Sequence, residues 1–250
     1  MNWSPPKRPV DHAEHALVTA ILEGEFPPGS TLPGERDLAA MVGVTRPTLR
    51  EALRRLERDG WLTIQQGKST VVNDFWREGG LNILSAIVRY SKRLPPDFVL
   101  NLLKVRLDMA PTYTRQAVEG AADIVVAQLA AYQALEDSPE AFAAYDWQLQ
   151  RCLTVASGNP IYPLILNGFS GIYEPLARFY FALPEARDSS RAYYAALLES
   201  ARRRDGEAAR RVTQAVMEES IHLWQRVSAD GRDPPTGRGA GTRRNVEAMR

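Results

Sequence analysis

The order of short elements near the start of this 250-residue chain constrains its fold more than any other feature. Apolar residues at helical spacing predict a first helix over 12–25, which stops before the Phe-Pro-Pro-Gly turn at 26–29. A short second helix is predicted over 35–42. It begins with acidic residues that complement the positive end of a helix dipole, and it stops at Gly43. The sequence therefore predicts a helix, a turn and a second, shorter helix.

A third helix and a β-hairpin are predicted next. Thr45 can cap the third helix with its hydroxyl, Pro47 fits the first turn because its missing N–H costs little there, and the helix runs to Gly60. The runs 61–65 and 70–72 are rich in β-forming residues and are separated by a turn built around glycine, so they predict a hairpin. Three helices and a hairpin in this order are what a winged helix-turn-helix requires.

The third helix has the surface that a DNA-reading helix needs. Three leucines form a dry inner stripe, and arginines recur every four residues on the opposite side. For an isolated helix the alternative is a solvated face, on which the arginines pair with neighbouring acidic side chains. The position of this helix between a short helix and a glycine-lysine hairpin tip favours DNA instead. The arginines are Arg46, Arg50, Arg54 and Arg58, and the leucines are Leu49, Leu53 and Leu56.

From Leu81 onward the sequence changes to long amphipathic segments without strand signals. The predicted fold class is therefore mainly α: an N-terminal winged helix-turn-helix of three helices plus a β-hairpin wing, followed by an all-α helical-bundle effector domain. The last segment is rich in Gly, Pro and Arg and cannot bury enough apolar surface to order itself. The predicted boundaries are 1–75 for the DNA-binding domain, 76–80 for the linker, 81–228 for the regulatory domain and 229–250 for a disordered tail.

Composition narrows the compartment and the class of function. The formal net charge is +1, so attraction to phosphates has to come from clustered arginines rather than from overall charge. There is one cysteine, no signal peptide and no apolar run of about 18 residues, so we expect a soluble, cytoplasmic protein that does not engage a membrane. No nucleophile elbow, phosphate loop, dinucleotide fingerprint or zinc motif occurs. We therefore expect no enzyme, no catalytic residues and no cofactor.

The sequence resembles the GntR family of bacterial transcription regulators. In the first domain the resemblance rests on FPPG at 26–29, LPGERDLA at 32–39 and GVTRPTLREAL at 43–53. In the second domain, ASGNPIY at 156–162 and YFALPEAR at 180–187 are similar to a branch of that family that regulates fatty acid metabolism. The resemblance covers nearly all of the chain before the predicted tail.

This resemblance implies a homodimer that represses fatty acid degradation genes and can activate genes of unsaturated fatty acid synthesis. It also implies that long-chain acyl-CoA releases the protein from a palindromic operator in double-stranded DNA. The DNA-binding positions that it implies are Arg36, Thr45, Arg46, Thr48, Arg50, Gly67 and Lys68.

The chemistry of these residues suggests which part of the DNA each would contact. Arg46 and Arg50 are candidates for guanine edges or groove phosphates, because a guanidinium can donate to guanine O6 and N7 together. Arg36 and Lys68 suit contact with phosphate or the minor groove. The two threonines can donate to phosphate from the helix start, although Thr45 also serves as the helix cap.

The resemblance also ties Arg106, Tyr180, Ser220 and Trp224 to the ligand. An acyl-CoA joins an anionic nucleotide to a long apolar chain, so its site needs a cation at the mouth and an apolar cavity. Ser220 and Trp224 lie one four-residue step apart on one helix face, where ordinary core packing is the alternative. Arg106 is either a phosphate clamp or a member of an ion pair near Asp108.

The sequence departs from the family pattern at four positions. Pro47 stands where the pattern has Thr, and Gln66 where it has His, so one donor at the helix start is missing and the specificity of the wing is open. Val216 and Met217 replace the expected Tyr and Gly near the ligand, so the cavity can differ in shape.

A metal-dependent effector site is the main rival. Many GntR relatives hold a carboxylate effector through a metal bound by one Asp and three His. Only His222 lies in the second domain here, since His12 and His15 belong to the first helix. We therefore expect no metal site. A GntR-type repressor that responds to another small metabolite, such as a carboxylate, remains the alternative function.

Overall fold

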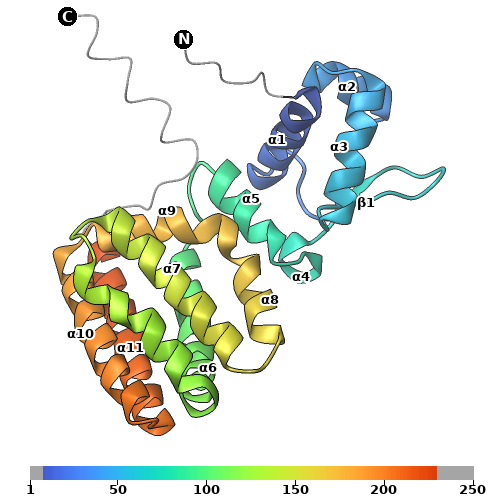
Figure 1. The fold of residues 1–250 in the computed structure, drawn as a ribbon. Coiled ribbons are helices and arrows are strands. Elements are labelled where there is room, and N and C mark those ends of the chain that lie inside the picture. The colour runs from blue at the N-terminus through green and yellow to red at the C-terminus, as the bar shows by residue number, and fades with distance from the viewer. Residues whose placement is uncertain (1–7, 230–250) are drawn as a thin grey trace, which may run out of the picture. The chain divides into compact units, whose positions relative to one another are not determined.

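The computed structural model describes residues 8–229, which divide into two compact units with the boundary between Leu94 and Pro95. The first unit contains three helices, a two-stranded hairpin and two further helices within the described residues (Figure 1). They are α1 (Pro9–Leu22), α2 (Glu35–Val42), α3 (Arg46–Arg58), β1 (Leu62–Thr63), β2 (Val71–Val72), α4 (Phe75–Glu78) and α5 (Asn82–Tyr90). The predicted winged helix-turn-helix is confirmed.

The three N-terminal helices pack around the leucine stripe of α3. Leu49 and Leu56 are fully buried, together with Leu17 of α1 and Leu38 of α2. Burying each such side chain stabilises the fold by roughly 2 kcal/mol. α1 ends earlier than predicted because Gly24 takes a left-handed conformation with φ of 81°. This core fixes α3 so that its arginine side points away from the unit's interior.

The hairpin is shorter than predicted but keeps its place. β1 and β2 are antiparallel, with Leu62 opposite Val72 and Thr63 opposite Val71. The segment after the Phe-Pro-Pro-Gly turn, which carried no strand signal, joins them through a bridge between Thr31 and Val71. Leu32 N also donates to Thr70 O at 2.8 Å. The wing is therefore anchored to the chain between α1 and α2.

The boundary between the compact units lies further along the chain than the predicted linker at 76–80, because α4 and α5 pack on the first unit. Phe75 of α4 lies against Trp61, with ring centroids 4.9 Å apart, and α5 packs on α1. A Cβ on Gly60 would lie 3.1 Å from Gly79 Cα, so the two backbones meet closely. The predicted tail at 229–250 lies outside the described residues except for Ala229, which ends the last helix.

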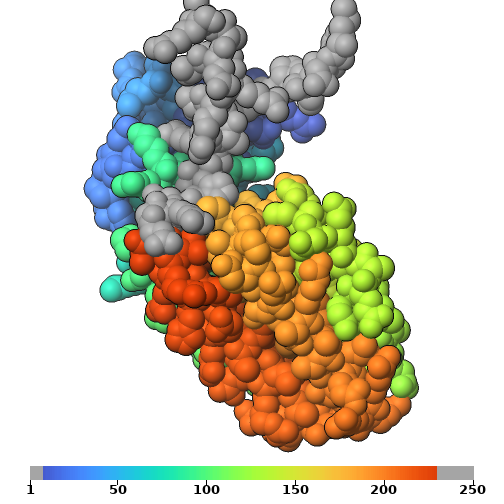
Figure 2. Space-filling view, turned by 90° about the vertical axis from the view of Figure 1, so that its left-hand side faces the viewer, coloured from blue at the N-terminus to red at the C-terminus, as the bar shows by residue number. Residues whose placement is uncertain are grey.

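The second unit is entirely helical within the described residues, so the predicted all-α domain is confirmed. Its long first helix is kinked at Ala121, whose backbone is not helical, and α10 and α11 lie side by side on the face shown in Figure 2. The elements are α6 (Phe98–Leu129), the 3-10 helix η1 (Ala130–Ala134), α7 (Pro139–Ala156), α8 (Ile161–Gly168), α9 (Ser170–Phe181), α10 (Pro184–Arg202) and α11 (Gly206–Ala229).

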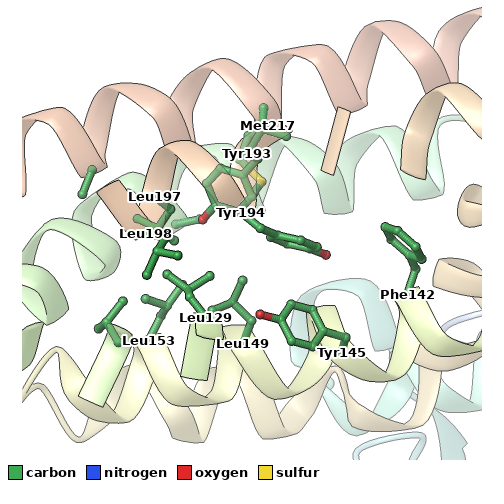
Figure 3. Close-up of a cluster of buried hydrophobic side chains, with 14 of the residues drawn as sticks. Leu129, Phe142, Tyr145, Leu149, Leu153, Tyr193, Tyr194, Leu197, Leu198 and Met217 are labelled. Carbon is green, nitrogen blue, oxygen red and sulfur yellow. The ribbon is translucent and has the colours of Figure 1, made fainter. Parts of the chain in front are cut away.

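The core of the second unit is rich in aromatic rings (Figure 3). Tyr194 of α10 is fully buried and lies against Phe142 and Tyr145 of α7, with ring centroids 6.4 and 4.9 Å away. Leu149 and Leu153 continue the same face of α7. This core joins α6, α7, α10 and α11, which leaves one side of α6 to line a cavity with α8 and α9.

Candidate functional site

The start of α3 is built as a capped and exposed helix end. Thr45 Oγ1 accepts from Thr48 N at 3.4 Å and lies 2.9 Å from Thr48 Oγ1, which confirms Thr45 as the N-cap. Gly43 precedes it in a left-handed conformation with φ of 75°, which turns the chain between α2 and α3. Arg46 and Arg50 are exposed on the side opposite the buried leucines.

The predicted DNA-binding arginines differ in their partners. Arg50 donates through Nε to Glu35 Oε2 of α2 at 2.7 Å, and Arg36 donates to its neighbour Asp37 at 3.1 Å. Arg46 makes no ion pair or side-chain hydrogen bond within residues 8–229. Arg46 is therefore fully available to a ligand, whereas Arg50 is held by one nitrogen and keeps its other N–H groups for a partner.

The wing supplies the remaining two positions. Gly67 at the tip has φ of 76°, a conformation that favours glycine, and Lys68 next to it is exposed. The wing projects from the hairpin beside the end of α3 (Figure 1). The structure thus groups the α3 positions and Arg36 on neighbouring helices and places Gly67 and Lys68 on a separate projection. Their contact with DNA stays a prediction.

A cavity of about 130 Å³ lies in the second unit, bounded mainly by α6, α8 and α9. Its α6 wall runs from Val99 to Tyr113, which corresponds to a length of about 21 Å at 1.5 Å per residue. Aliphatic and aromatic side chains dominate the lining, as a site for an apolar ligand requires. All four predicted ligand residues, Arg106, Tyr180, Ser220 and Trp224, are among those that line it.

Three of these four residues form one part of the cavity wall: Tyr180 and Ser220 supply two hydroxyls, and Trp224 supplies an aromatic ring. Tyr180 OH donates to Ser220 Oγ at 3.2 Å, and Ser220 Oγ donates to the Val216 carbonyl at 2.8 Å. Trp224 packs edge-on against Phe179 at 5.7 Å. Burial raises the pKa of Tyr180, so its hydroxyl stays protonated at neutral pH and keeps its donation to Ser220, with its oxygen left as an acceptor. Val216 is buried but does not line the cavity.

Arg106 is engaged in a buried ion pair that the sequence did not predict. Its Nη2 lies 2.7 Å from Asp146 Oδ2 of α7, and among residues 8–229 Arg106 makes no ion pair in the neighbourhood of Asp108. Burial is the largest single influence and opposes the charged form of Arg106, but the Asp146 carboxylate and the surrounding tyrosines together outweigh it and hold the pKa of the guanidinium above its ordinary value. Because this charge is already neutralised, Arg106 in this arrangement is a structural cation rather than a free phosphate clamp.

Asp146 is the centre of a network that lines the cavity. Gln150 Nε2 donates to its Oδ1 at 3.3 Å, and the hydroxyls of Tyr173 and Tyr194 also donate to it. Burial and then the Asp146 charge raise the pKa of Tyr173 well above its ordinary value. One signal in the sequence pointed here. Asp146 falls on the inward stripe of α7, and all the other residues of that stripe are uncharged.

Two further findings concern the whole described part of the chain. No group of three or more His, Cys, Asp or Glu side chains suited to a metal occurs between residues 8 and 229. No helix in that range combines the length and apolar character needed to cross a membrane.

Comparison with known proteins matches both units. Residues 9–72 match the family model described as bacterial regulatory proteins, gntR family, and residues 73–231 match the model described as FadR C-terminal domain. Because the second match begins at residue 73, α4 and α5 belong in sequence to the C-terminal model, although they pack on the first unit.

Individual relatives agree with the family models. The chain is 44% identical over 216 residues to the fatty acid metabolism regulator protein of Edwardsiella ictaluri, covering 86% of this chain and 90% of that one. It is 47% identical over 195 residues to the protein of the same name from Shewanella halifaxensis, covering 78% and 82%. A solved structure of Lar, described as controlling the Listeria monocytogenes agr system, shares the fold with a TM-score of 0.58 at 18% identity, covering 91% and 100%.

Proposed function

The chain belongs to the gntR family of bacterial regulatory proteins and carries a FadR C-terminal domain, and from this premise we propose that it regulates transcription of fatty acid metabolism genes. The family consists of transcription regulators rather than enzymes. In this proposal the first unit binds operator DNA and the second unit binds a long-chain acyl-CoA that causes release. The observation that carries it is one polypeptide with an outward arginine face on α3 and, in the second unit, a mainly apolar cavity lined along α6 from Val99 to Tyr113.

The DNA side of the proposal rests on the presentation of α3. Its leucines are buried, its capped N-terminus is exposed, and Arg46 and Arg50 point away from the core. A helix N-terminus favours phosphate through its free N–H groups, and a guanidinium reads guanine with about 1–3 kcal/mol of discrimination. Pro47 lies in the first turn, where it removes one N–H that could have met a phosphate.

The ligand side rests on the lining of the cavity. Burying about 16 methylene and methyl groups at roughly 0.8 kcal/mol each supplies on the order of 10 kcal/mol before ordering costs are subtracted. The cavity wall offers aliphatic and aromatic contacts for such a chain, and the hydroxyl oxygens of Tyr180 and Ser220 can accept from a polar group. Because Arg106 is paired with Asp146, exposed cations outside the cavity would meet the nucleotide phosphates.

The switch requires a homodimer in this proposal. Two α3 helices read half-sites about one DNA turn apart only when the dimer holds them at that spacing. The ligand can weaken DNA binding only by binding more tightly to an arrangement in which this spacing is lost.

The test is a titration of the full chain on a fluorescent palindromic site selected by this chain from a random DNA pool. Oleoyl-CoA is expected to lower the anisotropy to that of free DNA, whereas coenzyme A alone and oleate alone are expected to act only at much higher concentration. Sedimentation should show two chains per palindrome. Saturating oleoyl-CoA that is bound by calorimetry but leaves DNA affinity unchanged would reject ligand release. Release by citrate but not by oleoyl-CoA would favour the carboxylate alternative.

A further inference from the structure

A second pocket lies in the second unit, between α7 and α9. It is lined by residues of α7 from Glu140 to Gln148 and of α9 from Ser170 to Glu174, and we name it the α7–α9 pocket. Its volume of about 290 Å³ is close to the lower end of the range for small-molecule sites, roughly 300–1,000 Å³. Among its lining residues, only Tyr173 also lines the cavity described above. The α7–α9 pocket is therefore a separate place where a ligand can bind.

Two aromatic rings form part of this pocket. The rings of Trp147 on α7 and Tyr173 on α9 have centroids 4.8 Å apart and are tilted by 43° to each other. Both residues are half-buried. The Tyr173 hydroxyl already donates to Asp146, so its ring is the main group that Tyr173 offers to a ligand in this pocket. The faces of such rings attract cations, and the indole of Trp does so most strongly.

The exposed part of the pocket carries a net negative charge. Glu140 and Glu174 line it, and their side chains are 57% and 72% exposed. Both pair with Arg178, whose Nη2 lies 3.1 Å from Glu140 Oε1 and whose Nη1 lies 3.7 Å from Glu174 Oε1. One guanidinium thus compensates two carboxylates, and no Lys, Arg or His is among the lining residues. The α7–α9 pocket therefore attracts cations and repels anions, including the phosphates of coenzyme A.

The least exposed lining residues favour a cation without N–H groups. They are Ala143, Trp147 and Tyr173, which present one methyl group and two rings, and the phenol oxygen of Tyr173 is their only side-chain acceptor. A primary ammonium carries three N–H donors, and removing them from water without new acceptors is costly. A quaternary ammonium has no N–H to satisfy, and its methyl groups pack well against aromatic rings.

We propose that the α7–α9 pocket binds a small quaternary ammonium compound that carries a hydroxyl, as choline does. Trp147 and Tyr173 contact the methylated nitrogen, and the carboxylates of Glu140 and Glu174 add attraction over a longer range. Gln148 is exposed, makes no side-chain hydrogen bond within residues 8–229, and can bond the hydroxyl of the cation. The proposal requires neither an acyl ligand nor DNA, so it goes beyond the proposed function and does not depend on it.

The experiment is calorimetry of choline binding to the full chain without DNA or acyl-CoA. Wild type is expected to bind choline with a Kd on the order of 1 mM, and to bind the uncharged isostere, in which carbon replaces the nitrogen, at least tenfold more weakly. Trp147→Leu keeps an apolar side chain but removes the indole, so choline binding should weaken about fivefold or more. Trp76→Leu is the matched control. Trp76 is a 54% exposed indole of the first unit, and its loss should leave choline binding unchanged.

A second variant tests the charge of the pocket. Glu140→Gln/Glu174→Gln alters two exposed side chains and should weaken choline binding about tenfold and make it less sensitive to salt. Glu199→Gln breaks a surface pair with Arg203 elsewhere on the second unit and should leave choline binding unchanged.

Three outcomes would overturn the proposal. They are the absence of choline binding to wild type at tens of millimolar, equal affinity for choline and its uncharged isostere, and unchanged choline binding in either pocket variant. The isostere comparison uses wild type alone, and the glutamate variant changes only surface side chains. The test therefore remains decisive even if Trp147→Leu does not fold.

Discussion

Arg106 of α6 and Asp146 of α7 meet at 2.7 Å beside the cavity, although 40 positions separate them in the chain. The Asp146 side chain is 4% exposed and that of Arg106 is 24% exposed, so the pair is largely removed from water. Desolvation offsets much of the attraction in such a pair, and replacing both partners can be neutral. Removing only one partner is different, because the other charge is then buried without compensation.

The first prediction follows from this asymmetry. Asp146→Asn keeps the size of the side chain but removes its charge, which leaves the Arg106 guanidinium unpaired. We expect the free energy of unfolding to fall by about 3 kcal/mol, measured by urea unfolding followed by circular dichroism. The matched control is Asp123→Asn. Asp123 pairs with Arg204 at 2.8 Å, but the two side chains are 88% and 59% exposed, so the expected loss is below about 1 kcal/mol. Equal losses in the two variants would contradict the role of Asp146.

The second prediction concerns the cavity and uses two leucines of α8. Leu166 lines the cavity, whereas Leu164 is 64% exposed and does not. Leu166→Trp should fill part of the space, weaken oleoyl-CoA binding by tenfold or more and leave the protein on DNA at oleoyl-CoA concentrations that release wild type. Leu164→Trp adds the same ring to the surface and should respond as wild type. A normal oleoyl-CoA affinity in Leu166→Trp, measured by calorimetry, would place the ligand elsewhere.

The DNA-binding unit was largely predictable because its signals are local. Gly43 turns the chain before α3, Thr45 caps the helix through Thr48 N, and the leucine stripe faces inward, all within a few residues of one another. The bridge from Thr31 to the wing was not predictable, because it depends on where the preceding turn returns the chain. The docking of α5 on α1 was missed for a similar reason, since an apolar helix face does not indicate which element packs against it.

The cavity was less predictable than the DNA-binding unit. Resemblance to the family brought Arg106, Tyr180, Ser220 and Trp224 to one place, and all four do line the cavity. The charge on the inward face of α7 at Asp146 marked a special position, but no local rule connects it with an arginine 40 residues earlier. The hydrogen bond between Tyr113 and Gln150 was not predictable for the same reason, because these residues meet only through packing of α6 on α7.

The third prediction is a loss of stability in alkali. Burial raises the pKa of Tyr193 to about 12 in the folded chain, against an ordinary value of about 10. The folded state thus favours the neutral phenol, so this contribution to stability is complete below about pH 10 and is lost as the pH rises to about 12. Tyr193→Phe removes the group and should reduce the decline in unfolding free energy across this window by about 2 kcal/mol. Parallel pH profiles of wild type and variant in urea unfolding would refute this.

The fourth prediction separates base reading from phosphate attraction. Arg50→Ala should weaken binding to the selected palindrome by about tenfold or more and reduce its preference over random DNA, because a bidentate guanine contact is lost. Lys68→Ala should weaken binding to both DNAs similarly and lower the slope of log affinity against log salt by about one. Arg58→Ala is the control. Arg58 lies about 18 Å from Arg46 along α3 and pairs with Asp59, so little change is expected. Similar, small effects from Arg50→Ala and Lys68→Ala would show that α3 is not in the groove.

The fifth prediction follows from the contact of Arg50 with Glu35. Glu35 Oε2 accepts from Arg50 Nε at 2.7 Å and so fixes the direction of the guanidinium, but its negative charge also repels phosphates. Glu35→Gln weakens the hold on Arg50 and removes that charge. We therefore expect affinity for random DNA to rise while the ratio of palindrome to random binding falls, both by severalfold at constant salt. Glu51→Gln is the comparison, since Glu51 pairs with Arg55 on the same helix and does not contact Arg50. It should raise random binding without lowering the ratio. If the ratio is unchanged in Glu35→Gln, Arg50 does not depend on Glu35 to reach the bases.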